Sequence, residues 1–277
     1  MPTLSQQTRL ALDELGAHPH KKFGQNFLVD ASVVGRMIRA AGIDPTDTVL
    51  EIGPGLGVLS ESLVGLSRRL YLVEIDTILA ERLQQRFAQC ANVRIVTGDF
   101  LSLDLDSLFS ESPIHVVASL PYNVAMPILF RLLEHRRRFP DATVMLQKEV
   151  ADRLSAKPGT KEYGALTVLM QLYAIVTKVL TVQPGSFFPA PKVQSQVVKL
   201  SFQEAPRVAI HDERRFRQVV KAAFAQRRKT LRNTLKAAGY PDLEALSIRT
   251  DIDFQRRGET LNLEEFAKLA NAFGGGG

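Results

Sequence analysis

Four consecutive residues, Ser119-Leu120-Pro121-Tyr122, follow an apolar run at 114–118 and have the types needed to hold an amino group on a planar ring. A serine hydroxyl and a backbone carbonyl can each accept one N–H hydrogen bond, and a tyrosine ring can cover the face of a base. This arrangement favours methylation of an exocyclic nitrogen. Taken alone, the tetrapeptide also fits a strand end with a proline turn, so its meaning depends on the rest of the chain.

A glycine-rich loop, Gly53-Pro54-Gly55-Leu56-Gly57, follows a predicted strand at 48–52 and precedes a predicted helix at 58–66. Glycines let a ligand approach the backbone closely, and a helix N-terminus offers free N–H groups. The spacing differs from the dinucleotide fingerprint Gly-x-Gly-x-x-Gly, and Pro54 removes a backbone donor that a pyrophosphate would use. The loop therefore favours a ligand other than a dinucleotide.

Two acidic residues follow the next two predicted strands. Glu74 ends the first of these strands, and Asp99 lies in Gly98-Asp99-Phe100 after the second. A carboxylate at the Glu74 position suits a bidentate grip on two ribose hydroxyls, and Asp99 can accept a hydrogen bond from an adenine amino group. Each also has a simpler interpretation, as a solvated strand end or a helix cap. Together they predict S-adenosyl-L-methionine as the cofactor, because ribose and adenine are recognised without a phosphate site.

The elements that must position these residues are those of a doubly wound α/β sheet, because short β-rich runs alternate with helical stretches between residues 48 and 200. Such sheets bind ligands at the carboxyl ends of their strands, where Gly53, Glu74 and Asp99 fall. The predicted strands cover residues 48–52, 70–74, 93–97, 115–118, 142–147, either 164–170 or its continuation at 174–182, and 196–201. The predicted fold class is α/β, a Rossmann-like methyltransferase sheet followed by a small all-helical C-terminal domain.

Basic residues are concentrated in that C-terminal part. The chain has 35 Lys+Arg against 29 Asp+Glu, and nine basic residues with no acidic one lie between Arg214 and Lys236. Such a window indicates a polyanion-binding surface more than an ordinary solvated helix face. We therefore predict two domains, an S-adenosylmethionine-binding methyltransferase domain at 1–203 and a helical RNA-binding domain at 204–277.

Composition also restricts the setting. Cys90 is the only cysteine, so an intramolecular disulfide and a cysteine-only metal site are excluded, and the histidines show no metal-binding spacing. The first 22 residues lack the apolar core of a signal peptide, and no apolar run approaches the length of a membrane span. We expect a cytoplasmic monomer that uses neither a membrane nor a metal.

The chain resembles one family over nearly its whole length, the ribosomal RNA adenine N6-dimethyltransferases. The long motifs at the two ends are specific, whereas the glycine loop alone is not. The motifs that carry the resemblance are Lys21-Lys22-Phe23-Gly24-Gln25-Asn26-Phe27-Leu28, the loop from Glu51 to Gly57, Leu120-Pro121-Tyr122-Asn123, Phe187-Phe188-Pro189-Ala190-Pro191-Lys192-Val193, and Phe224-Ala225-Gln226-Arg227-Arg228-Lys229-Thr230-Leu231-Arg232-Asn233.

The resemblance implies dimethylation of two adjacent adenosines near the 3′ end of small-subunit ribosomal RNA, within an immature 30S subunit and late in its assembly. It also implies that Phe187 and Tyr122 sandwich a flipped-out adenine. The cofactor site implied in this way, together with the loop, comprises Asn26, Leu28, Gly53, Gly55, Glu74, Asp99 and Ser119. For phosphate contacts we expect the basic residues Lys21, Lys22, Arg227, Arg228, Lys229 and Arg232.

Ser119 is where the chain departs from the family pattern, which usually has asparagine before Leu-Pro-Tyr. A serine hydroxyl can accept a hydrogen bond, but it is shorter than an asparagine side chain and need not reach the same point. We therefore expect reduced but real methyl transfer.

Three other functions stay open on the sequence. Ser119 favours an RNA-binding assembly factor that has lost most of its catalysis. Large-subunit ribosomal RNA is an alternative target for the same chemistry. A DNA amino-methyltransferase is weaker, because no separate domain for reading duplex sequence is visible.

Overall fold

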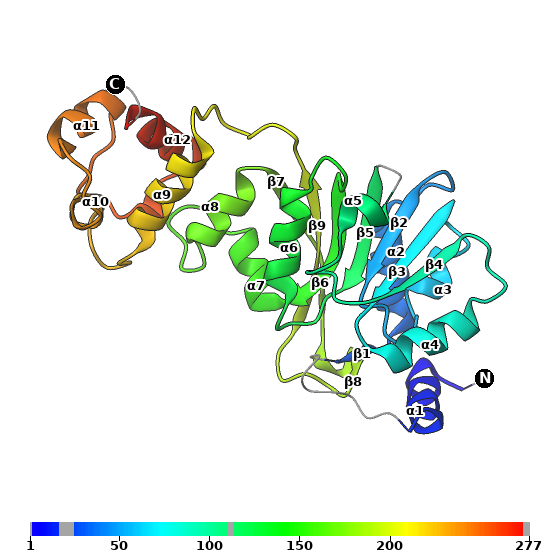
Figure 1. The fold of residues 1–277 in the computed structure, drawn as a ribbon. Coiled ribbons are helices and arrows are strands. Elements are labelled where there is room, and N and C mark those ends of the chain that lie inside the picture. Colours follow the sequence, from blue (N-terminus) through cyan, green and yellow to red (C-terminus); the bar gives the residue numbers. More distant parts are fainter. Residues whose placement is uncertain (1, 17–24, 110–112, 274–277) are drawn as a thin grey trace. The chain divides into compact units, whose positions relative to one another are not determined.

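The chain folds into two compact units in the computed structural model, which describes residues 2–16, 25–109 and 113–273 (Figure 1). The first unit comprises Met1–Ala151 with Val176–Phe202, and the second comprises Asp152–Ile175 with Gln203–Gly277. None of the described helices is both long enough and apolar enough to cross a membrane.

The first unit is built on a seven-stranded sheet with the order β4-β3-β2-β5-β6-β9-β7. Strands β4, β3, β2, β5 and β6 are parallel, and β9 runs antiparallel to β6. This mostly parallel sheet confirms the predicted α/β class. The strand bounds are β2 Thr48–Ile52, β3 Arg69–Glu74, β4 Val93–Thr97, β5 Ile114–Ser119, β6 Asp141–Gln147, β7 Ala174–Val182 and β9 Ser195–Phe202.

Both faces of this sheet are covered, so every residue of β2 is buried. On one face, Val49 and Leu72 pack with Met37 of α2. On the other, Tyr71 meets the ring of Phe109 edge-on at 4.9 Å between centroids. The helices of the first unit are α1 Leu4–Glu14, α2 Ala31–Ala41, α3 Ser60–Leu63, α4 Thr77–Arg86, α5 Leu105–Leu108 and α6 Ala125–Glu134, and α7 Lys148–Leu154 runs across the boundary between the units.

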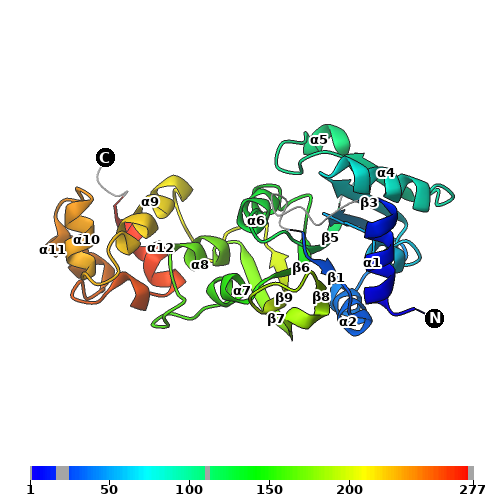
Figure 2. The same cartoon turned by 90° about the horizontal axis from the view of Figure 1, so that it is seen from below.

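A two-stranded sheet lies beside α1 (Figure 2). It pairs β1 (Phe27–Leu28) antiparallel with β8 (Phe187–Phe188), which follows the short 3-10 helix η2 (Pro184–Ser186). Ala11 and Leu12 of α1 pack against Phe27 and against Leu56 of the glycine loop. The N-terminal helix is therefore anchored next to that loop.

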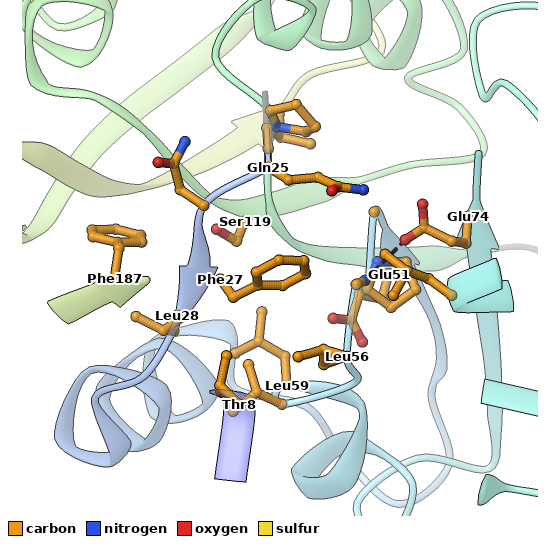
Figure 3. A pocket seen from close by; sticks show the side chains of 18 of the residues that line it. Thr8, Gln25, Phe27, Leu28, Glu51, Leu56, Leu59, Glu74, Ser119 and Phe187 are labelled. Atoms are coloured by element: carbon orange, nitrogen blue, oxygen red, sulfur yellow. Dashed lines mark hydrogen bonds between the residues drawn. The ribbon is translucent and has the colours of Figure 1, made fainter. Parts of the chain in front are cut away.

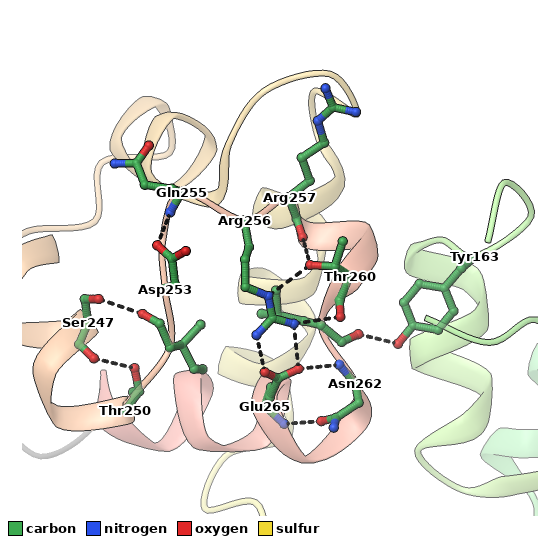
Figure 4. A network of polar contacts seen from close by, with 12 residues as sticks. Tyr163, Ser247, Thr250, Asp253, Gln255, Arg256, Arg257, Thr260, Asn262 and Glu265 are labelled. Carbon is green, nitrogen blue, oxygen red and sulfur yellow. Dashed lines mark hydrogen bonds and ion pairs between the residues drawn. The ribbon is translucent and has the colours of Figure 1, made fainter. Parts of the chain in front are cut away.

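The second unit is helical and includes a segment that the sequence-based boundary at 203/204 assigned to the first domain. Tyr163, in this 152–175 segment, donates a hydrogen bond from its buried hydroxyl to the Leu261 carbonyl at 2.9 Å (Figure 4). Phe224 stacks on Phe266 with ring centroids 5.8 Å apart. The elements are α8 Ala165–Gln171, α9 Glu213–Phe224, α10 Leu231–Ala237, α11 Leu243–Thr250, η3 Gly258–Thr260 and α12 Leu263–Ala272.

Two predictions of local structure need correction. The strand predicted at 164–170 or at its continuation 174–182 lies at the second of these positions, as β7. Residues 164–170 form most of helix α8 instead of a strand. Its first turn is fixed locally, because the Thr167 hydroxyl accepts a hydrogen bond from Gly164 N–H at 3.2 Å, and a short apolar run does not by itself distinguish a strand from a buried helix. The helix predicted at 58–66 is limited to the four residues of α3.

His115 links three segments at the amino ends of the strands and predicts a pH-dependent stability. Its Nδ1 lies 2.8 Å from Asp141 Oδ2, and its Nε2 lies 3.8 Å from Asp47 Oδ1. The hydrogen bond to Asp141 raises the pKa of His115, burial and Lys199 oppose this, and the charges of both carboxylates add to it. Because the pKa is raised on folding, the stabilisation is complete below the unfolded-state pKa and is lost as pH rises through the folded-state pKa.

We expect His115→Asn to lower the free energy of unfolding by about 1 kcal/mol near pH 5.5 and by much less near pH 9. Urea unfolding of wild type, His115→Asn and the exposed control His211→Asn across this pH range measures the difference. An equal loss at every pH would mean that the ion pair is not the source of the effect.

Candidate active site

The strand registers place three polar side chains on one face of the sheet at its carboxyl end. Glu51 is two residues beyond Val49 on β2, and Val49 is opposite Leu70 of β3 and His115 of β5. Because successive side chains alternate between faces, Glu51, Glu74 and Ser119 share the face of Val49. These three residues line one pocket (Figure 3).

The glycine loop is held against β3 by backbone hydrogen bonds. Gly53 N–H donates to the Val73 carbonyl at 2.9 Å, and Gly55 N–H donates to Glu74 Oε2 at 2.9 Å. Gly53 and Gly55 have φ values of 68° and 59°, a region that side chains rarely adopt. A Cβ atom on Gly55 would also lie 3.2 Å from the ring of Phe27. The loop therefore needs glycine for its backbone conformation and for the close approach of Phe27.

Glu74 is buried, and each of its carboxylate oxygens accepts a backbone hydrogen bond. Oε1 accepts from Asp76 N–H at 3.0 Å, and Oε2 accepts from Gly55 N–H. Burial raises the pKa of Glu74, whereas these hydrogen bonds oppose the rise. The carboxylate is thus fixed in place with further lone pairs available to a ligand. Asp76 in turn caps α4 and accepts a hydrogen bond from Gln25 Nε2 at 3.0 Å.

Glu51 was not predicted as an individual site residue, although it lines the pocket. Its side chain is 2% exposed, and its Oε2 accepts a hydrogen bond from the Ser60 hydroxyl at 2.6 Å. Burial raises the pKa of Glu51 to about 8, the Ser60 hydrogen bond opposes the rise, and the charge of Glu74 adds to it. The sequence did contain a signal for this site residue, because an acidic residue inside a strand that is expected to be buried on both faces is unusual.

The tetrapeptide begins with Ser119, the last residue of β5, and continues into the turn that follows the strand. Leu120 N–H donates to the Met145 carbonyl at 3.2 Å, and Val124 N–H donates to the Pro121 carbonyl at 3.2 Å. The Tyr122 hydroxyl lies 2.6 Å from the hydroxyl of Ser195, a fully buried residue at the start of β9. Burial raises the pKa of Tyr122. Within the described part of the chain, the Ser119 side chain makes no hydrogen bond, so its hydroxyl is available to a ligand.

The β1–β8 pair brings the predicted residues of two distant motifs together. Leu28 is opposite Phe187 in the register, and both side chains line the pocket (Figure 3). Asn26, Gly53 and Tyr122 belong to the same lining. The full lining consists of Thr8, Gln25, Asn26, Phe27, Leu28, Glu51, Gly53, Pro54, Gly55, Leu56, Val58, Leu59, Glu74, Ile75, Leu79, Ser119, Leu120, Pro121, Tyr122 and Phe187.

Asp99 lies apart from this group and lines an adjoining, mostly apolar cavity. Its carboxylate accepts a hydrogen bond from Leu101 N–H at 2.9 Å. The two cavities share Gly53, Ile75 and Pro121, so a ligand longer than one cavity can occupy both. The other residues of the second cavity are Ile52, Val73, Gly98, Phe100, Asn123, Val124 and Ile128.

The predicted phosphate-binding residues of the second unit fall into two kinds. Arg227 is engaged by the Lys161 carbonyl at 2.6 Å and by Glu259 at 3.3 Å, and Arg232 pairs with Glu244 at 2.7 Å. Arg228 and Lys229 are exposed and form no ion pair with another described residue. Acidic residues from outside the 214–236 window therefore pair with two of its arginines in the folded unit. Lys21 and Lys22 lie outside the described residues.

The bond between Tyr122 and Ser195 predicts that the two hydroxyls act as one unit. We expect Ser195→Ala and Tyr122→Phe each to lower kcat about tenfold, which corresponds to the loss of one hydrogen bond of about 1.4 kcal/mol. The double variant should be no slower than either single variant, and Ser195→Thr should restore most of the rate. Steady-state kinetics of the four proteins tests this double-mutant cycle. Additive losses would show that the two residues act independently.

Comparisons with known proteins agree on one family. The family model for ribosomal RNA adenine dimethylases matches residues 16–274. A protein of Syntrophotalea carbinolica called ribosomal RNA small subunit methyltransferase A is 48% identical over 254 residues, which cover 91% of this chain and 96% of the relative. A Bacillus mycoides protein of the same name is 42% identical and covers 96% of this chain and 95% of the relative.

Solved structures agree with this assignment. A dimethyladenosine transferase from Plasmodium falciparum superposes with a TM-score of 0.75 at 27% identity, covering 88% of this chain and 95% of that chain. The 23S rRNA methyltransferase ErmE superposes with a TM-score of 0.73 at 25% identity, covering 90% and 100%. The predicted methyltransferase type of the sheet is thereby confirmed. The chain belongs to the ribosomal RNA adenine dimethylase family and is an rRNA methyltransferase.

Proposed function

We propose that the pocket binds S-adenosyl-L-methionine along the glycine loop and holds a flipped-out adenine between Tyr122 and Phe187. The reaction follows from the family: the enzyme is an S-adenosylmethionine-dependent (adenine-N6,N6)-dimethyltransferase of small-subunit ribosomal RNA. One observation carries the proposed site. A single pocket contains the buried carboxylate of Glu74 and the glycine loop together with Ser119, Tyr122 and Phe187.

The methyl donor fits the two adjoining cavities. The remaining lone pairs of Glu74 accept hydrogen bonds from the two ribose hydroxyls. The adenine of the donor enters the apolar cavity beside Ile75 and Phe100, where Asp99 accepts from its amino group. Asn26, Leu28 and Gly53 remain for the methionine part, next to Ser119.

Catalysis rests on positioning and electrostatics. Adenine N6 is a poor nucleophile because its lone pair is conjugated into the ring. Hydrogen bonds from its two N–H groups to the Ser119 hydroxyl and the Leu120 carbonyl favour a pyramidal nitrogen whose lone pair faces the methyl sulfonium. The proton leaves to water after the methyl group has moved. The sulfonium of the donor leaves as a neutral sulfide when its methyl group is attacked, so the mechanism that we propose uses no metal.

We further propose that the substrate is ribosomal RNA in an immature 30S subunit, modified in the cytoplasm by a monomeric enzyme at a late step of subunit biogenesis. The names of the bacterial relatives support the small-subunit target. The exposed basic pair Arg228 and Lys229 supports RNA binding by the second unit.

Arg228 and Lys229 give a prediction about salt. If each contacts one phosphate, the slope of log K against log salt for RNA binding should fall by about 0.7–0.9 per residue removed. We expect Arg228→Ala/Lys229→Ala to reduce the slope by about 1.5 in filter-binding titrations with the small-subunit RNA. Arg232→Ala is the comparison, because its ion pair with Glu244 predicts a smaller change. An unchanged slope in the double variant would place the RNA elsewhere.

The proposed function is tested with unmodified small subunits and labelled S-adenosyl-L-methionine. Mass spectrometry of the 3′-terminal RNA fragment should show two dimethyladenosines. Absence of label from small subunits overturns the proposal. Cofactor-independent RNA binding without transfer would support the assembly factor, the alternative that Ser119 favours, and label in the large subunit would support the other target.

A further inference from the structure

Glu51 is an almost fully buried acid to which the mechanism above gives no role. It lies at the carboxyl end of β2, within the lining of the proposed cofactor pocket (Figure 3). Among the described residues, the only hydrogen bond to its carboxyl group comes from the neutral Ser60 hydroxyl. A buried ionised carboxylate needs a stronger partner than this. Burial therefore favours the neutral, protonated form of Glu51 over the ionised form.

The pocket contains no compensating positive charge within the described part of the chain. Its titratable lining residues are Glu51, Glu74 and Tyr122, and the charge of Asp76, a third carboxyl group, acts on Glu74. The pocket-lining residues that come from α1 and β1 are uncharged, namely Thr8, Phe27 and Leu28. Two carboxyl groups thus share one cavity without a cation.

Two arginines of α4 line an adjoining cavity, which shares Thr8, Leu56 and Val58 with the pocket. Arg86 donates to the Leu56 carbonyl at 2.9 Å and pairs with Glu61, and Arg82 pairs with Glu14. Arg82, Arg86 and Glu61 line the cavity beyond the glycine loop, and none of them lines the pocket of Glu51. Among the described residues no cation lines the pocket of Glu51, so a cationic ligand would supply the matching charge.

The electrostatics fix the state of Glu51 in the empty pocket. Its pKa of about 8, raised mainly by burial, means that most of the carboxyl groups carry a proton at pH 7. A positive charge brought into the pocket stabilises the ionised form and returns the pKa toward its ordinary value.

We propose that Glu51 is the counter-charge of the methyl donor, releasing its proton to solvent when the donor binds. This inference rests on the proposed cofactor site. The donor carries a sulfonium, an ammonium and a carboxylate and is a net cation, whereas the product left after methyl transfer is a sulfide and is neutral overall. Glu51 therefore favours the donor over the product. This preference helps spent cofactor to leave before each further methylation.

Calorimetry of ligand binding tests the inference on the whole protein. Titrations at pH 7 in two buffers with different ionisation enthalpies give the number of protons released. We expect roughly one proton for S-adenosylmethionine and for the cationic analogue sinefungin, and clearly fewer for S-adenosylhomocysteine. The donor Kd should fall up to about tenfold per pH unit between pH 6 and 8 and then level off, because binding selects the ionised group.

Variants assign the proton to its residue. Glu51→Gln should abolish the release and lower the ratio of donor to product affinity about tenfold, whereas the exposed control Glu81→Gln should behave as wild type. Ser60→Ala removes the hydrogen bond that lowers the pKa of Glu51, so the pH midpoint should move upward; it keeps the test informative if Glu51→Gln is unstable.

The outcomes separate the two proposals. Equal proton release with donor and product, or release that persists in Glu51→Gln, would overturn the role of Glu51 while leaving the cofactor site intact. Failure of wild type to bind either ligand would instead overturn the proposed cofactor site itself.

Discussion

Glu74→Ala should weaken S-adenosylmethionine binding at least about 100-fold and remove detectable methyl transfer. A hydrogen bond to a charged group contributes roughly 1.5–3 kcal/mol, and the proposed site loses two of them at the ribose. The substitution also leaves Gly55 N–H and Asp76 N–H without their acceptors. The loop that must receive the donor therefore loses an anchor as well as its ligand contact. Calorimetric titration with the donor measures the loss directly.

Two further variants separate binding from folding. Glu74→Gln keeps the size of the side chain and one oxygen acceptor, so it should bind the donor weakly but melt near the wild-type temperature. Glu81→Ala removes an exposed carboxylate from α4 and should change neither binding nor melting. If Glu74→Ala binds the donor as wild type does, the cofactor site is not where we place it.

The position of a site residue was predictable where an acidic residue ends a strand next to the glycine loop, whereas its role stays a prediction. Glu74 was such a case, because it follows the glycine loop by one strand in a fold whose ligands lie at carboxyl ends. Ser195 was not predictable. Its hydroxyl reaches Tyr122 because β9 lies next to β6 in the sheet. This strand order depends on the tertiary structure and cannot be read from the local sequence.

The same limit explains two differences in the fold. The run at 164–170 is apolar and rich enough in branched residues to suggest a strand, yet it packs as α8 with the C-terminal helices. The basic window is free of acidic residues only along the sequence, since Glu244 and Glu259 return to Arg232 and Arg227 from distant positions. Periodicity and composition describe local preference, whereas the partners of a side chain depend on which segments meet.

Glu51 shows what the structure adds to the motif from Glu51 to Gly57. The sequence placed it in a strand before the glycine loop, as part of a family pattern. The structure adds three observations: Glu51 is buried, its only hydrogen-bond partner among the described residues is a hydroxyl, and no described cation lines the pocket. The proposal that Glu51 pairs with a charged ligand rests on these observations. The proposed role of Glu51 in donor binding and the proposed role of Ser119 in methyl transfer can therefore be tested separately.

Ser119→Ala should lower kcat about 100-fold while leaving the Kd of S-adenosylmethionine within a few-fold of wild type. The hydroxyl faces the pocket and makes no hydrogen bond to another described residue, so its acceptor capacity is reserved for the substrate (Figure 3). Removing one preorganised hydrogen-bonding group that acts in the transition state typically costs 10²–10³ in kcat. Single-turnover rates with saturating donor and unmodified small subunits measure this step.

Ser119→Asn tests the same position in the opposite direction. A carboxamide oxygen extends farther from the backbone than a hydroxyl and is the acceptor that the family pattern usually provides, so this variant should be faster than wild type. Ser195→Ala is the useful comparison, because it loosens the Tyr122 ring without touching the amino group. Wild-type kcat in Ser119→Ala would show that the Ser119 hydroxyl is not the acceptor of the second N–H. A rate that rises in Ser119→Asn and falls in Ser119→Ala would make the length of this one acceptor the factor that limits methyl transfer.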